Sequence, residues 1–282
     1  MTFPTSTLTL PAPRPFLKWA GGKARLIPQY LPHLPQRFET YHEPFLGGGA
    51  LFFYLAPQLK SAYLSDLNPE LVNVYRCVRD HLDDVLTCLE KHQLHHSQQH
   101  YYRVRAERDL APIQRAARLI YLNKTCYNGL YRENQQGHFN VPMGRYKNPK
   151  ICNPELLAAT SEALQIAEIE QRTFEAAATL ARGADDFVYF DPPYHPISDT
   201  SCFTAYSRFS FKAADQERLR ATFTQLAERG VSVLLSNSDC EFVRNLYQGF
   251  TIHPITAARA INSKASKRGK VGEVLVSNSV GR

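Results

Sequence analysis

The chain has 282 residues, of which 44% are hydrophobic and 21% charged, and its formal net charge is +7. These proportions fit a globular protein and argue against a disordered or fibrous chain. No apolar run reaches the 18 residues of a membrane-spanning helix. Residues 1–15 are rich in Thr and Pro and lack the pattern of a signal peptide, so we expect a mobile leader. Without that signal, the six cysteines favour free thiols in a reducing cytoplasm.

The positive charge is concentrated in two separate stretches of the chain. Residues 69–152 hold 13 Lys or Arg against 8 Asp or Glu, and residues 259–270 hold 5 against none. Residues 153–258 instead hold 8 against 14. This asymmetry suits a polyanion bound across two parts of the chain. The charge alone leaves a solvated basic surface equally open.

Strand-like runs occur at residues 40–43, 63–66, 187–191, 231–236, 251–255 and 271–276, and helical patterns such as 50–56 and 215–229 separate most of them. This alternation predicts an α/β fold with a mostly parallel sheet. It lapses in residues 69–161, where helices are expected over 71–88, 101–109 and 112–124 before a loop rich in Gly, Asn and Pro. We therefore expect one α/β domain, formed by residues 16–68 and 162–282, with a helical insert at 69–161 and strands resuming near 165–174.

A glycine-rich turn follows the first expected strand. Residues 43–50 read Glu-Pro-Phe-Leu-Gly-Gly-Gly-Ala, and the glycines let the backbone turn tightly and approach a ligand. The next strand ends at Asp66, where doubly wound sheets place an acid that binds ribose hydroxyls. The third glycine of GxGxxG is missing, which disfavours NAD and leaves other nucleosides open.

A more specific signal is Asp-Pro-Pro-Tyr at residues 191–194, directly after an apolar strand. Its position predicts the ligand-binding carboxyl edge of the sheet. Two prolines stiffen the loop and donate no backbone N–H. The Asp191 carboxylate and the Pro192 carbonyl are then fixed acceptors beside the aromatic face of Tyr194. This combination suits a planar base that carries an exocyclic amine.

Six segments in order resemble the DNA adenine-N6 methyltransferases of the Dam type, the alpha group of the D12 class. They are residues 16–23 (Phe-Leu-Lys-Trp-Ala-Gly-Gly-Lys), 43–49, 65–68 (Ser-Asp-Leu-Asn), 122–132 (Leu-Asn-Lys-Thr-Cys-Tyr-Asn-Gly-Leu-Tyr-Arg), 139–147 (Phe-Asn-Val-Pro-Met-Gly-Arg-Tyr-Lys) and 191–194. The resemblance covers roughly residues 16–276. It implies a Rossmann-like class I methyltransferase sheet with an inserted helical DNA-recognition domain, and methylation of the adenine N6 of duplex DNA by base flipping.

The resemblance also implies S-adenosylmethionine as the methyl donor and assigns roles by position. Asp191, Pro192 and Tyr194 would act on the base. The residues implied for the cofactor site are Trp19, Lys23, Phe45, Gly47, Gly49, Asp66 and Asp191. The chemistry needs no metal, and we expect His92, His95, His96 and His100 to lie on a solvent face or helix end.

Recognition of DNA is assigned to the insert, with GATC as the expected site. Arg132 is expected to read guanine in the major groove, and the neighbouring Glu133 to pair with it or orient it. A late basic segment is expected to clamp phosphates. The residues implied are Lys18, Tyr127, Asn128, Leu130, Arg132, Pro142 and Arg145, with Lys264, Lys267 and Arg268 in the late segment. Double-stranded DNA is the expected partner. A cognate restriction endonuclease that acts on the same site without stable contact is left open beside a solitary, nucleoid-associated enzyme.

Three alternatives remain at this point. The first is an enzyme of the same class acting on RNA, cytosine N4 or another planar amide, which the motif at residues 127–132 disfavours. The second is a DNA-binding protein without activity, which the intact residues 191–194 and glycine turn disfavour. The third is an NAD-dependent enzyme, which the missing glycine disfavours.

Overall fold

The computed structural model describes residues 10–196, 211–258 and 270–278. Within these residues the strands form one seven-stranded sheet of order β3-β2-β1-β4-β5-β7-β6. The strands β3, β2, β1, β4 and β5 pair in parallel, and β7 is antiparallel to both β5 and β6. This confirms the predicted α/β class with a mostly parallel sheet. The bounds are β1 (Thr40–Glu43), β2 (Ser61–Ser65), β3 (Ala167–Glu170), β4 (Asp186–Phe190), β5 (Ser232–Ser238), β6 (Thr251–Ala258) and β7 (Lys270–Ser277).

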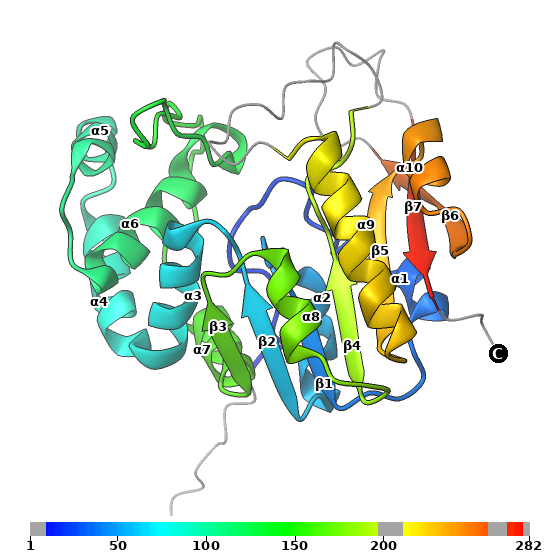
Figure 1. Cartoon of the computed structure of the whole chain (residues 1–282). Helices are drawn as coiled ribbons and strands as arrows, with labels where there is room; N and C mark the ends of the chain where they lie inside the picture. The colour runs from blue at the N-terminus through cyan, green and yellow to red at the C-terminus, as the bar shows by residue number, and fades with distance from the viewer. Residues whose placement is uncertain (1–9, 197–210, 259–269, 279–282) are drawn as a thin grey trace, which may run out of the picture.

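Helices cover both faces of the sheet, with α8 and α9 on one side and α2 on the other (Figure 1). Two-sided burial explains why the central strand β4 is apolar after its first residue. In β4, Phe187 and Tyr189 join one hydrophobic cluster, and Val188 and Phe190 join the other, because successive side chains of a strand point to opposite faces. The bounds here are α1 (Ile27–Tyr30), η1 (Leu31–His33), α2 (Ala50–Leu55), η2 (Ala56–Gln58), η4 (Phe174–Ala176), α8 (Ala177–Leu180), α9 (Ala213–Glu228) and α10 (Glu241–Leu246).

Between β2 and β3 the chain forms a helical region that lies beside the sheet (Figure 1). Its elements are α3 (Pro69–Asp80), α4 (Leu82–Leu94), α5 (Gln98–Ala106), α6 (Pro112–Thr125), η3 (Tyr127–Gly129) and α7 (Pro154–Leu164). The buried α6 packs against α3, α4 and α5. The single helix expected over residues 71–88 was wrong. The backbone of His81 has non-helical angles, with φ −137° and ψ 43°. This residue ends α3, and α4 begins after it in a new direction and packs on α6.

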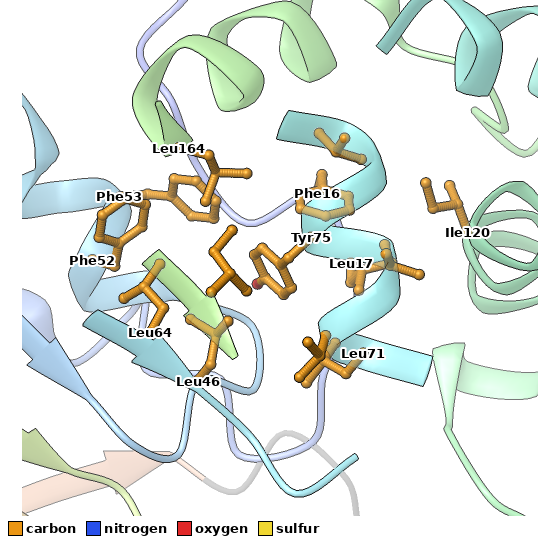
Figure 2. Packing of buried hydrophobic residues seen from close by; sticks show 14 of the residues in the cluster. Phe16, Leu17, Leu46, Phe52, Phe53, Leu64, Leu71, Tyr75, Ile120 and Leu164 are labelled. Atoms are coloured by element: carbon orange, nitrogen blue, oxygen red, sulfur yellow. The ribbon is translucent and has the colours of Figure 1, made fainter. Parts of the chain in front are cut away.

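The segment before the sheet is fixed by burial of Phe16 and Leu17 in the large hydrophobic cluster. The Phe16 ring meets Tyr75 of α3 edge-on, with ring centroids 5.1 Å apart (Figure 2). This packing holds the next two residues, Lys18 and Trp19, at the junction between the sheet and the helical region. The expected leader falls partly on residues 1–9, which lie outside the described residues. In the described part of the chain, no helix is long and apolar enough to cross a membrane.

A histidine cluster lies between α4, α5 and α6 in the helical region. The Nδ1 atom of His92 lies 3.0 Å from Nε2 of His100, and Arg103 donates to Nδ1 of His100 over 2.7 Å. The His92 ring stacks on Tyr121 of α6. Among the described residues, no group of three or more His, Cys, Asp or Glu side chains is arranged to hold a metal ion. Burial, and then the nearby charges of His100, Arg103 and His95, lower the pKa of His92 to about 4.

We expect this cluster to make the protein sensitive to acid. Because the folded pKa of His92 lies below the value near 6.5 of the unfolded chain, the unfolded state binds more protons between pH 6.5 and 4. As the pH falls from 6.5 to 4, the free energy of unfolding should therefore decrease by about 2 kcal/mol. His92→Phe, which keeps the stacking on Tyr121, should reduce this fall in urea titrations at pH 7 and pH 4. An unchanged pH dependence in the variant would assign the loss to other groups.

Candidate active site

Three loops meet at one edge of the sheet. Because β1 pairs in parallel with β2 and β4, the carboxyl ends of these strands lie side by side. The glycine turn follows β1, the Asp66 loop follows β2, and the Asp191 loop follows β4. In doubly wound sheets, ligands bind at this edge, where the strand order reverses. The sequence therefore places its three strongest motifs in one site.

The glycine turn is held close to Trp19. Gly47 and Gly49 have φ of +47° and +63°, a region that favours glycine. A Cβ on Gly47 would lie 3.0 Å from Cδ1 of Trp19, so a larger residue would displace that ring. The hydroxyl of Tyr75 donates to the Gly47 carbonyl over 3.1 Å. Gly49 then caps α2, so the turn presents backbone at the site with no side chain between.

The Asp66 carboxylate connects the glycine turn to β2. Its Oδ2 accepts from the Gly47 amide at 3.1 Å, and its Oδ1 accepts from the Asn68 amide at 2.9 Å. Burial raises the pKa of Asp66, and the backbone donors oppose that shift. Each carboxylate oxygen can accept a second hydrogen bond. The geometry therefore fits an acceptor for a pair of ribose hydroxyls.

The Asp191 carboxylate has two partners on the same oxygen. Its Oδ1 lies 3.0 Å from Nζ of Lys23 and accepts from Oγ of Ser236 over 2.7 Å. The Lys23 side chain is 7% exposed and also donates to the Gly21 carbonyl. Among the described residues, Oδ2 of Asp191 has no hydrogen-bond partner, and the Asp191 side chain is 20% exposed. One oxygen is thus fixed by the protein and the other is left for a ligand.

Three side chains that the sequence analysis did not assign hold the loop at residues 191–195. Gln216 donates to the Pro193 carbonyl over 3.1 Å, and Asn237 accepts from the His195 amide over 3.1 Å. Asn237 donates to Gln216, and Ser238 donates to the His195 carbonyl. Gln216, Asn237 and Ser238 are buried. The run Ser-Asn-Ser at residues 236–238, polar at the end of an apolar strand, was the signal that could have found two of them and the Asp191 partner Ser236.

The predicted site residues fall into distinct environments. Trp19 is partly buried and lies 5.3 Å from the ring of Tyr131 in the helical region. The Lys23 ammonium lies 4.5 Å from the centre of the Tyr194 ring. Phe45 instead packs among aromatic rings below the turn, with Phe174, Phe190 and Phe211. The structure thus brings together Trp19, Lys23, Gly47, Asp66, Asp191 and Tyr194, and it places Phe45 in a supporting aromatic cluster.

Asn123 joins the segment before the sheet to the predicted recognition residues. Its Oδ1 accepts from the Lys18 amide, and its Nδ2 donates to the carbonyls of Lys18 and Gly129, all within 2.7–3.1 Å. Tyr127 is 53% exposed, and its amide bonds the Pro142 carbonyl. Asn123 thereby positions Lys18 beside the turn at residues 127–130.

The remaining recognition residues present polar groups around this turn. Arg132 donates from Nε to Oδ1 of Asn140 over 2.7 Å, whereas Glu133 accepts from the Tyr131 hydroxyl. Arg145 is exposed, and the Lys18 ammonium lies 4.2 Å from the centre of the Tyr146 ring. Burial, and then the charges of Lys18 and Arg14, lower the pKa of Lys124 to about 8. Lys264, Lys267 and Arg268 lie outside the described residues.

We expect Gly129→Ala to disrupt this junction. Gly129 has φ +64°, and a Cβ there would lie 2.6 Å from the Cβ of Lys18. Backbone strain of this kind costs roughly 1–3 kcal/mol, and Lys18 would also be displaced. Thermal unfolding should show the loss of stability, and DNA affinity should fall with it. Gly183→Ala is the matched control, because nothing lies within 4 Å of a Cβ there and its φ is ordinary. Equal behaviour of the two variants would contradict the close approach.

The sheet order, the glycine turn, the acid after β2 and the acidic loop after β4 define a Rossmann-like fold with a nucleoside-type site at its carboxyl edge. A profile of the D12 class N6 adenine-specific DNA methyltransferases matches residues 19–261, and the chain belongs to this family. It is therefore an enzyme that methylates adenine N6 in DNA, with S-adenosylmethionine as the donor.

Curated relatives match over nearly the whole chain. Type II methyltransferase M1.LlaDCHI of Lactococcus lactis subsp. cremoris is 46% identical over 275 residues, which cover 94% of this chain and 95% of the relative. Type II methyltransferase M.MjaIII of Methanocaldococcus jannaschii is 41% identical, over 94% of this chain and 99% of the relative. The DNA adenine methylase of Escherichia coli K12 is 38% identical, over 93% of this chain and 94% of the relative. These matches confirm the resemblance to the Dam-type enzymes.

Proposed function

We propose that this enzyme methylates adenine within GATC of duplex DNA, after rotating the base out of the helix into the site at Asp191. The observation that carries the proposal is the asymmetric Asp191 carboxylate, with Oδ1 held by Lys23 and Ser236 and Oδ2 left for a donor. The target amine lies inside a base pair of duplex DNA, where such a recessed carboxylate cannot reach it. A flipped base removes that obstacle.

The amine needs activation because its lone pair is delocalised into the adenine ring. Asp191 and the Pro192 carbonyl accept its two hydrogens, which favours a more tetrahedral nitrogen and frees the lone pair. Bound S-adenosylmethionine supplies an electrophilic methyl group on a sulfonium. Fixed acceptors on a stiff loop lower the barrier by positioning and electrostatics, because they need no reorganisation during the reaction. Asp191 need not remove a proton before attack, since the methylated cation loses one afterwards.

The donor is held, in this proposal, by the glycine turn and by Asp66. The ribose hydroxyls bond the free lone pairs of Asp66, and the backbone of Gly47 and Gly49 lies against the methionine part. Trp19, whose ring contacts the Gly47 position, closes one wall. Phe45 acts from its aromatic cluster as support for the turn. The positive φ angles of the turn support this assignment, since a side chain there would fill the space.

Recognition of GATC is assigned to residues 69–161 together with Lys18. Tyr127 is exposed beside Leu130 and Pro142, as a side chain that fills or wedges a base step must be. Arg132 is oriented by Asn140 with donors to spare. Lys18 and Arg145 add positive charge on the same region, and Asn128 holds the left-handed turn conformation at φ 55°. The basic segment with Lys264, Lys267 and Arg268 is proposed to bind phosphates.

The biological setting follows from the substrate. An enzyme that acts on chromosomal DNA works in the cytoplasm on the nucleoid. Two of the relatives named above are type II methyltransferases, which supports a cognate restriction endonuclease that shares the recognition site without stable contact. An enzyme without that partner is the alternative.

The test is expression in cells that lack adenine methylation, followed by genome-wide mapping of modified bases. We expect N6-methyladenine at GATC sites and nowhere else above background. N6-methyladenine at another sequence would contradict GATC as the recognition site, but it would still agree with methylation of adenine N6. N4-methylcytosine, or methylated RNA with unmodified DNA, would overturn the substrate. Calorimetry with S-adenosylmethionine adds a readout of donor binding that does not depend on turnover.

A further inference from the structure

Tyr194 is anchored to a strand far from it in the sequence. Its hydroxyl donates to Oε2 of Glu273 over 2.8 Å, across 79 residues of chain. Glu273 lies on β7 and pairs in register with Ser238 of β5 and Ile255 of β6. Because β7 runs antiparallel to β5, this register brings Glu273 to the carboxyl edge where the Asp191 loop lies. A loop side chain is therefore bonded to a half-buried residue of a sheet strand.

Two contacts restrain different motions of the Tyr194 ring. The hydroxyl lies on the axis of the ring, so the bond to Glu273 fixes where that axis points. The Lys23 ammonium, 4.5 Å from the ring centre, lies over the face and restrains rotation about the axis. Lys23 is itself fixed by Asp191 and the Gly21 carbonyl. The ring plane is thus set before any substrate arrives.

Glu273 is unusual for its position. It is a half-buried acid that lies between the exposed Gly272 and the buried apolar run Val274, Leu275 and Val276. A charged group in such a place is unfavourable unless a partner compensates for its desolvation. Burial raises the pKa of Glu273, while the charge of Lys23 and the bond from Tyr194 lower it. Pairing of β7 with its neighbours does not require an acid at this position. The hydrogen bond from Tyr194 therefore explains why a glutamate is found here.

We propose that Glu273 is a positioning residue for methyl transfer, which acts by holding the Tyr194 ring in the plane on which the flipped adenine stacks. This inference rests on the proposed function at the same site. Hydrogen bonds to charged acceptors are the stronger kind, and a stacking platform must keep its angle to present the amine to Asp191. In this proposal Glu273 contacts neither the base nor the donor, and its effect passes through Tyr194.

The experiment is a double-mutant cycle in the full-length enzyme with a duplex DNA substrate. We expect Tyr194→Phe and Glu273→Ala each to lower kcat about tenfold, the size of one charge-assisted hydrogen bond, with little change in KM for S-adenosylmethionine. Their combination should be no slower than either alone. Glu273→Gln, which keeps an acceptor for the hydroxyl, should retain most of the activity. Glu228→Gln on the exposed side of α9 is the matched control for loss of charge.

The possible results distinguish a failure of the Glu273 inference from a failure of the proposed function. If Glu273→Ala still lowers kcat when Tyr194→Phe is already present, Glu273 acts through Lys23 or through its charge, and the inference fails. It fails as well if Glu273→Gln is as slow as Glu273→Ala, or if Glu273→Ala has wild-type kcat. Thermal unfolding of each variant separates loss of fold from loss of positioning. Wild-type enzyme that leaves duplex DNA unmethylated would overturn the proposed function, and this inference with it.

Discussion

Asp191→Ala should lower methyl transfer at least about a thousandfold, because it removes the fixed acceptor that turns the adenine amine into a nucleophile. DNA affinity should change by less than a few fold, since the predicted DNA contacts lie on the helical region, on Lys18 and on the late basic segment. The measurements are single-turnover methylation and fluorescence anisotropy with the same duplex. Near-normal turnover would remove Asp191 from the mechanism.

The alanine variant carries a side effect that needs its own control. Lys23, which is 7% exposed, would lose its carboxylate partner and be left as a buried unpaired charge. Removing one member of a buried ion pair is strongly destabilising. Asp191→Asn keeps the shape and the bond from Ser236 while removing the negative charge, and Lys23→Met in the same background removes the unpaired cation. A stable double variant that still binds S-adenosylmethionine and is inactive would assign the loss to chemistry and not to folding or donor binding.

The positions of the motifs could be predicted because they depend on local sequence and on one general rule. An apolar strand followed by a glycine turn or by Asp-Pro-Pro-Tyr indicates a carboxyl end, and parallel pairing brings such ends together. The meeting of Gly47, Asp66 and Asp191 followed from that rule. Lys23 was placed in the site by resemblance, and the structure adds that it pairs with Asp191.

The partners of these residues were harder to predict because they depend on register. The acid Glu273 lies in a strand whose apolar run gives no information about the neighbouring strand or its direction. A shift of one residue would turn Glu273 to the opposite face of the sheet. In the same way, Asn123 lies inside a helix, and its contact with Lys18 spans 105 residues. Neither contact has a local sequence signal.

The helix break at His81 has a related cause. The sequence around it contains neither Gly nor Pro, the residues that usually end a helix. The break accompanies packing of both helices, since α3 and α4 each contact α6 and α7 from a different direction of the chain. Tertiary contacts here decide against local helix propensity, which is a weak constraint on its own.

Arg132→Ala should relax sequence choice more than it weakens binding. Arg132 is half-buried, and its Nε is held by Oδ1 of Asn140, so its guanidinium has a fixed direction before DNA binds. A fixed guanidinium suits bidentate contact with guanine O6 and N7, worth about 1–3 kcal/mol of discrimination. We therefore expect about tenfold to hundredfold less preference for the cognate site over sites with one changed base pair, measured by competitive methylation of a substituted duplex series.

A residue that contacts phosphate would affect binding to all duplexes equally. We use Arg145 as the control for this behaviour. Arg145 is exposed, and Arg145→Ala should weaken all duplexes alike and reduce the salt slope of binding by about one unit. Asn140→Ala leaves the Arg132 charge but frees its direction, so it should reduce discrimination in the same sense as Arg132→Ala and leave the salt slope unchanged. If Arg132→Ala instead lowers affinity uniformly and flattens the salt slope, Arg132 binds the backbone, and base reading must be sought at Lys18 and Tyr127.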